Sequence, residues 1–81
     1  MSRYSIETSD KPRTVVRTVN DGWGHHEPCD SATAAIYEYA RRRGLTVSGL
    51  CYDADTRGGV FAEASLTRYG AHVCHAVATR I

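Results

Sequence analysis

The chain has 81 residues, of which 42% are hydrophobic and 23% charged, and its formal net charge is +1. A chain of this length has room for a single hydrophobic core, so we expect one domain over residues 1–81, and this composition excludes an intrinsically disordered protein. The balance of charges excludes a global field that would draw the protein to nucleic acid or to an anionic membrane.

The expected location of the protein is the cytoplasm. Its three cysteines form an odd number and none is close to another in the sequence, which is typical of reduced thiols rather than of a disulfide framework. The first eight residues are mostly polar and lack the apolar stretch of a secretory signal, and no apolar run is long enough to cross a bilayer.

The N-terminal part of the chain predicts a β-hairpin. Residues 3–8 alternate, with Tyr4 and Ile6 on one face and polar side chains on the other, which is the pattern of a half-buried strand. A turn cluster at residues 9–12 follows, and residues 13–19 alternate again and are rich in β-branched side chains. Because the connection is short, we expect the two strands to pair.

Residues 20–30 interrupt this pattern and form the longest irregular segment that we expect in the chain. Gly22, Gly24 and Pro28 oppose a regular helix or strand there.

An amphipathic helix is predicted next. Asp30 or Ser31 can cap its start, and Gly44 is the natural residue just past its end. Glu38 and Arg42 have the i,i+4 spacing of a favourable ion pair. The apolar stripe, at helical spacing, consists of Ala32, Ala35, Ile36, Tyr39 and Ala40. The opposite side carries Thr33, Tyr37, Glu38, Arg41 and Arg42.

The remainder of the chain predicts a three-strand meander over residues 45–53, 60–66 and 71–79, with turn residues between the segments. The expected fold class is therefore α+β, in the order β-β-α-β-β-β, with one amphipathic helix packed on an antiparallel sheet. The last segment is apolar on both faces, which favours a central strand. The helix covers one sheet face, so the other face meets solvent or a partner. An exposed edge along residues 3–8 or 71–79 would allow a homodimer by strand pairing.

Soft metal ligands are present, but their spacing is not that of a zinc knuckle. A tetrahedral zinc site needs four converging ligands, and the chain has no Cys-x-x-Cys pair. We therefore interpret Cys51 and Cys74 as small hydrophobic residues in strands and predict no metal site. A Cys/His zinc module or a metal-dependent enzyme remains an alternative, with the candidate ligands His25, His26, Cys29, Cys51, Cys74 and His75.

No catalytic residue is predicted. Cys74 and His75 are adjacent in a strand, so their side chains point to opposite faces and cannot pair. Asp53 and Asp55 flank a turn, where aspartates ordinarily bind the backbone. A thiolate at Cys29, ahead of the helix, is an alternative, but no oxyanion motif accompanies it. We expect a non-enzymatic protein without a cofactor.

Binding to RNA or DNA is a further alternative. Arg41, Arg42 and Arg43 cluster at the end of the predicted helix, and Tyr37 precedes them by one turn. Aromatic and arginine side chains together are a common means of binding single-stranded nucleic acid. The net charge of +1 favours instead a solvated arginine face.

Protein binding is the function that we favour. Trp, Tyr and Arg dominate the energetics of protein interfaces, and Trp23 lies in the irregular segment between two glycines. The predicted partner-binding residues are Trp23, His25, His26, Tyr37, Arg41 and Arg42.

The layout of the chain resembles small phage-encoded anti-CRISPR proteins, many of which place one helix against an antiparallel sheet. The resemblance rests on the polar start at residues 1–3, the hairpin, the helix opening at residues 30–35 and the closing strands. It implies a stoichiometric inhibitor in a bacterial host that occupies a surface of a CRISPR-Cas or other defence ribonucleoprotein complex. It assigns no functional residue.

Overall fold

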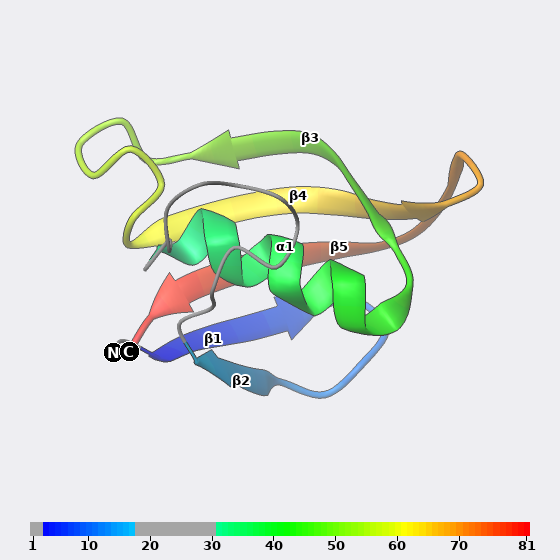
Figure 1. Ribbon diagram of the computed structural model, residues 1–81, viewed down its shortest axis with the longest axis horizontal. Coiled ribbons are helices and arrows are strands. Elements are labelled where there is room, and N and C mark those ends of the chain that lie inside the picture. The colour runs from blue at the N-terminus through cyan, green and yellow to red at the C-terminus, as the bar shows by residue number, and fades with distance from the viewer. Residues whose placement is uncertain (1–2, 18–30) are drawn as a thin grey trace.

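The computed structural model describes residues 3–17 and 31–81, which form one helix and five strands (Figure 1). The elements in chain order are β1 (Arg3–Thr8), β2 (Thr14–Arg17), α1 (Ala32–Arg43), β3 (Thr46–Tyr52), β4 (Phe61–Arg68) and β5 (Ala71–Arg80). This is the predicted α+β fold with the predicted order of elements. The described residues include no helix that is long and apolar enough to cross a membrane.

The five strands form a single antiparallel sheet in the order β2-β1-β5-β4-β3. The predicted hairpin β1–β2 and the predicted meander β3–β4–β5 are both present. The two groups join through β5, whose Ala78 is in register with Ile6 of β1 on one side and with Ala62 of β4 on the other. The prediction that the last strand is central is thereby confirmed.

The prediction of a free edge along residues 3–8 or 71–79 was wrong. β1 lies between β2 and β5, and β5 lies between β1 and β4, so both strands are paired on both sides. Among residues 3–17 and 31–81, the strands at the two edges of the sheet are β2 and β3. The first and last strands are far apart in sequence, and the alternation within each strand carries no information about that long-range pairing.

The helix begins and ends through backbone caps that its sequence specifies. Ser31 has an extended backbone (φ −152°), and its Oγ accepts a hydrogen bond from the Ala34 N–H at 3.0 Å. Gly44 adopts the left-handed conformation (φ 69°), and the Leu45 N–H returns to the Ala40 carbonyl at 2.8 Å. Both ends of α1 therefore lie where the sequence predicts them.

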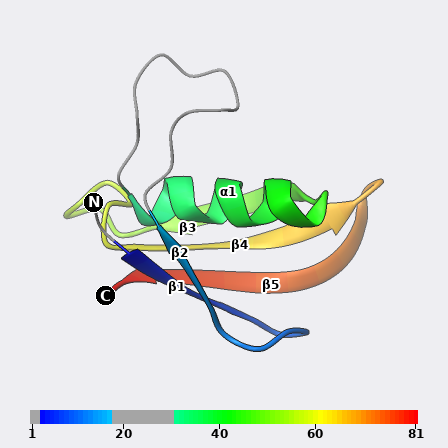
Figure 2. The same ribbon diagram turned by 60° about the horizontal axis from the view of Figure 1, so that its bottom comes forward.

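The core lies between α1 and one face of the sheet, as the view in Figure 2 shows. All five residues of the predicted helix stripe are buried. Four alanines of β4 and β5 lie on the covered sheet face and allow the helix to approach closely: Ala62, Ala64, Ala76 and Ala78. Tyr4, Ile6, Val16 and Leu66 supply the larger buried side chains. Within the described residues, no element covers the opposite face of the sheet (Figure 2).

Candidate functional site

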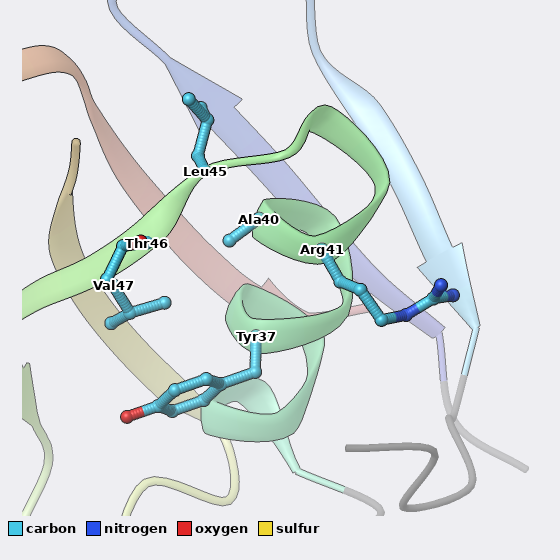
Figure 3. A pocket seen from close by; sticks show the side chains of 6 residues that line it. All are labelled: Tyr37, Ala40, Arg41, Leu45, Thr46 and Val47. Atoms are coloured by element: carbon cyan, nitrogen blue, oxygen red, sulfur yellow. The ribbon is translucent and has the colours of Figure 1, made fainter. Parts of the chain in front are cut away.

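A groove lies between α1 and the edge strand β3 (Figure 3). Its cavity has a volume of about 290 Å³. The lining residues are Tyr37, Ala40, Arg41, Leu45, Thr46 and Val47. A space of this size can admit one or two amino-acid side chains, but it is smaller than the pockets that enclose most small-molecule ligands.

The helical wall of the groove comes from Tyr37, Ala40 and Arg41, which share one helix face at i, i+3 and i+4 spacing. Val47 of β3 forms the strand wall. It packs against the core and is in register with Leu66 of the neighbouring strand β4. In Figure 3 the Tyr37 ring, the Ala40 methyl group and Val47 lie on the same side of the helix. The cavity surface is therefore largely apolar.

Arg41 contributes its aliphatic stem to the groove rather than its charge. Its guanidinium donates two hydrogen bonds to Glu38, from Nε to Oε1 at 3.1 Å and from Nη2 to Oε2 at 2.7 Å. Figure 3 shows this side chain extending away from Val47. The hydrogen bonds to Glu38 raise the pKa of Arg41 above its ordinary value. Because the Arg41 charge is paired with Glu38, the surface that the groove offers to a ligand is apolar.

Glu38 is the buried carboxylate behind this arrangement, with 6% of its surface exposed. It also accepts a hydrogen bond from Arg42 Nε at 2.7 Å, which confirms the predicted i,i+4 pair. The hydrogen bond from Arg41 is the main cause that lowers the pKa of Glu38, and burial opposes it. The sequence predicts Glu38 on the polar side of the helix, and it does lie there, but it is buried. Burial of this carboxylate is tolerated because the guanidiniums of Arg41 and Arg42 donate hydrogen bonds to its oxygens.

β3, the strand that borders the groove, is an edge strand without charge, and no other described strand pairs with its outer side. Its sequence, Thr46–Tyr52, contains no Asp, Glu, Lys or Arg. Natural sheets usually protect long exposed edges with charged residues, prolines or bulges, because an unpaired strand invites pairing with another chain. The other edge, β2, has four residues, and arginines stand at its end and just before it. β3 has a bulge but neither a charged residue nor a proline, so it is less protected against an added strand than β2.

A β-bulge lies in the middle of β3. Ser48 is in register with Ser65 and Cys51 with Glu63, so β3 has one extra residue between these pairs. Gly49 adopts the left-handed conformation there (φ 62°). As a consequence Val47 and Tyr52 share the helix side of the sheet although they are five residues apart, since their partners Leu66 and Ala62 are both buried under α1.

The structure brings together part of the predicted partner-binding set. Tyr37 and Arg41 line the groove, and Arg42 lies beside them on Glu38 without reaching the cavity. The predicted residues Trp23, His25 and His26 fall outside the described residues.

Sequence reasoning missed the contribution of β3 to this site. Leu45, Thr46 and Val47 form one wall of the groove, yet their pattern indicated only a strand. The uncharged stretch from Gly44 to Tyr52 was a signal that could have identified the strand as one without protecting charges.

The charge of the arginine cluster at the helix end is partly neutralised by nearby carboxylates. Arg41 and Arg42 are held by Glu38, and Arg43 is held by Asp10 through Nη2–Oδ2 at 2.7 Å. Three guanidiniums are thus shared between two carboxylates, which reduces the positive field available to a phosphate backbone.

The described cysteines occupy different environments. Cys74 is buried, as predicted, and burial is the main cause that raises the pKa of its thiol. Cys51 lies in a strand, as predicted, but it is exposed, because the bulge directs it to the uncovered sheet face. His75 lies on that same open face, opposite to Cys74, with its Nε2 2.9 Å from Oε1 of Glu63.

The remaining candidate catalytic and metal-binding residues either form hydrogen bonds within a turn or are not grouped together. Asp53 accepts hydrogen bonds from the Thr56 N–H at 3.0 Å and the Phe61 N–H at 3.3 Å, as predicted for a turn aspartate. Among residues 3–17 and 31–81, no three His, Cys, Asp or Glu side chains are grouped so that they could hold a metal ion. The predicted ligands His25, His26 and Cys29 lie outside these ranges.

Comparisons of the chain with protein-family models, with curated proteins and with solved structures found no match.

Proposed function

We propose that this chain is a small non-enzymatic protein-binding domain that adds an extended segment of a protein partner to β3. The observation that carries this proposal is the apolar groove directly beside an uncharged free edge strand. Strand addition at a sheet edge is a common mode of peptide recognition, in which main-chain hydrogen bonds give affinity and a neighbouring pocket selects a side chain.

The chemistry of the bound segment follows from the groove. The walls are the Tyr37 ring, the Arg41 stem, Ala40, Leu45 and Val47, so the segment places an apolar side chain between helix and strand. Tyr37 supplies a large, rigid contact area of the kind that dominates interface energetics. β3 repels neither acidic nor basic partners, because it has no charged side chain.

Selection from a displayed library of random peptides would test this proposal. We expect wild-type protein to enrich extended sequences with an apolar anchor, and an enriched peptide to shift the backbone amide NMR signals of β3. Thr46→Lys, which places a charge on the uncharged edge strand β3, should weaken binding at least about tenfold. Thr79→Lys, at an exposed threonine on the uncovered sheet face, is the matched control. Equal loss in both variants, or shifts confined to other strands, would contradict the proposal.

A narrower form of this proposal is a stoichiometric inhibitor of a CRISPR-Cas or other defence complex. It is supported by the resemblance in layout to phage-encoded anti-CRISPR proteins and by the small size of the domain. Target cleavage by purified effector complexes, with and without an equimolar amount of the protein, tests it. Unchanged cleavage in every effector class would contradict this narrower form and would leave the proposal of protein binding in place.

A nucleic-acid-binding regulator is the alternative that the arginine cluster suggests. Phosphate contacts make affinity fall steeply with salt concentration, whereas an apolar groove does not. A salt titration of binding to single-stranded RNA and to the selected peptide therefore separates the two functions.

A further inference from the structure

We propose that two copies of the free protein pair through β3, and that Tyr52 of each copy fills the groove of the other. The inference deepens the proposed function, because it names an occupant of the same site and a means of regulating access to it. Tyr52 is an exposed large side chain, with 53% of its surface accessible, and it lies on the helix side of β3. Each copy thus carries both the groove and a side chain of the type that the groove accepts.

The register of this pairing follows from the β-bulge. Antiparallel pairing of two identical strands about a two-fold axis keeps paired residues on the same sheet face. In a regular strand, residues five apart face opposite sides, and Val47 could not lie opposite Tyr52. The extra residue between Ser48 and Cys51 brings Val47 and Tyr52 to one face, so residues 47–52 of β3 can pair with the same residues of a second copy about the bulge.

In this register Val47 lies opposite Tyr52 of the second copy, and Ser48 lies opposite Cys51 of the second copy. Directly opposed residues in an antiparallel pair have Cβ atoms about 4.5–5.5 Å apart. A tyrosine opposite Val47 is therefore next to the strand wall of the groove, within reach of Tyr37 and Ala40 on the helix.

Charge does not oppose a second copy as the occupant. β3 has no charged side chain, and the whole chain has a net charge of only +1, so two copies do not repel each other strongly. The other free edge is less suited, since β2 is short and follows Arg13 and ends at Arg17. Self-pairing through β3 would also cover an edge that has no protecting charge or proline and only a bulge.

Sedimentation of the full chain from about 1 µM to about 1 mM tests the association. We expect a concentration-dependent shift from the 8.9 kDa chain to twice that mass. Tyr52→Ala should weaken the dimer about tenfold or more, because it removes the side chain that fills the groove. Tyr69→Ala, at a fully exposed tyrosine in the turn between β4 and β5, is the control and should leave the association unchanged.

A disulfide tests the register. The variant Ser48→Cys adds one thiol to β3 in each copy. On mild oxidation its dimer should form two intermolecular disulfides, each joining position 48 of one copy to Cys51 of the other. Within one chain these positions lie about 7–10 Å apart along the strand, too far for a disulfide. Mass spectrometry of the oxidised dimer should identify the 48–51 linkage between chains; its absence in a protein that sediments as a dimer would overturn the register.

The outcomes separate this inference from the proposed function. A wild-type protein that stays monomeric throughout but binds the selected peptide would overturn the dimer and leave the proposed function intact. A wild-type dimer whose Tyr52→Ala monomer binds no peptide would leave the dimer and overturn the proposed function. If both hold, the Tyr52→Ala monomer should bind the peptide more tightly than the wild type at high protein concentration, because self-pairing no longer competes.

Discussion

Arg43, the last residue of α1, holds Asp10 in the β1–β2 connection through two hydrogen bonds, Nη1 to Oδ1 at 3.1 Å and Nη2 to Oδ2 at 2.7 Å. The same guanidinium donates to the Tyr39 hydroxyl at 3.2 Å and lies over the Tyr39 ring, 5.6 Å from its centroid. This arrangement ties the end of the helix to the N-terminal hairpin, and it holds the pKa of Asp10 well below its ordinary value.

The first prediction concerns the pH dependence of stability. Because the pKa of Asp10 is lower in the folded protein, its contribution to stability is present above the unfolded pKa, near 3.8, and is lost as pH falls toward the folded value. Asp10→Asn should therefore lower the melting temperature at neutral pH, and its difference from wild type should shrink below about pH 4. Circular dichroism melts over a pH series measure this.

Asp55→Asn is the matched control for Asp10, since Asp55 is an exposed aspartate in another turn. It should change the melting temperature little at any pH. If the difference in melting temperature between Asp10→Asn and wild type stays constant through the acid range, the ion pair between Asp10 and Arg43 is not its cause.

The second prediction concerns the buried carboxylate. Glu38→Gln removes the charge that Arg41 and Arg42 share, and we expect a loss of about 1 kcal/mol in the free energy of unfolding, less than is usual for charged hydrogen bonds because both arginines are half exposed. For a domain of this size that lowers the melting temperature by about 4–8 °C. Glu7→Gln, at an exposed glutamate of β1, is the control; an equal loss there would show that burial of Glu38 is not the cause.

The third prediction compares two glycines with the same backbone conformation. Gly58 and Gly70 have φ values of 79° and 80°. A Cβ at Gly70 would meet nothing within 4 Å, so Gly70→Ala should cost only the left-handed conformation, about 1–2 kcal/mol. A Cβ at Gly58 would clash with the Thr33 hydroxyl and crowd the Tyr52 side chain, so Gly58→Ala should cost about 1–3 kcal/mol more.

Denaturant unfolding of the two alanine variants gives this comparison directly. The extra loss in Gly58→Ala arises where the loop carbonyl of Gly58 accepts hydrogen bonds from both the backbone N–H and the hydroxyl of Thr33, at 3.0 and 3.2 Å. Equal stabilities would mean that the loop yields to the added methyl group without disturbing the start of α1.

The fourth prediction separates the roles of Tyr37 and Arg41 in the groove. Arg41→Met keeps the aliphatic stem and removes a charge that Glu38 already compensates, so affinity for a selected peptide should stay within about threefold. Tyr37→Ala removes the largest side chain of the helical wall and should weaken binding about tenfold or more. A larger loss in Arg41→Met than in Tyr37→Ala, measured by fluorescence anisotropy, would instead favour a charged ligand such as nucleic acid.

Local features of the sequence determined the helix and the strands of this protein. The Ser31 cap, the alanine-rich stripe and the Gly44 stop each act within a few residues, and together they specified α1 closely. Alternation likewise identified residues 3–8 as a strand with Tyr4 and Ile6 inward. These signals are readable because helix capping and side-chain periodicity depend on near neighbours.

Only the tertiary structure decided which strands are edges and therefore where the candidate site lies. The pairing of Tyr4 with Arg80 joins opposite ends of the chain, and it moved β1 and β5 into the sheet and left β3 at its edge. The burial of Glu38, the outward direction of Cys51 after the bulge and the groove beside Val47 all depend on packing between distant elements. The sequence by itself determined the pieces of the fold, and long-range strand pairing determined the surface that they present.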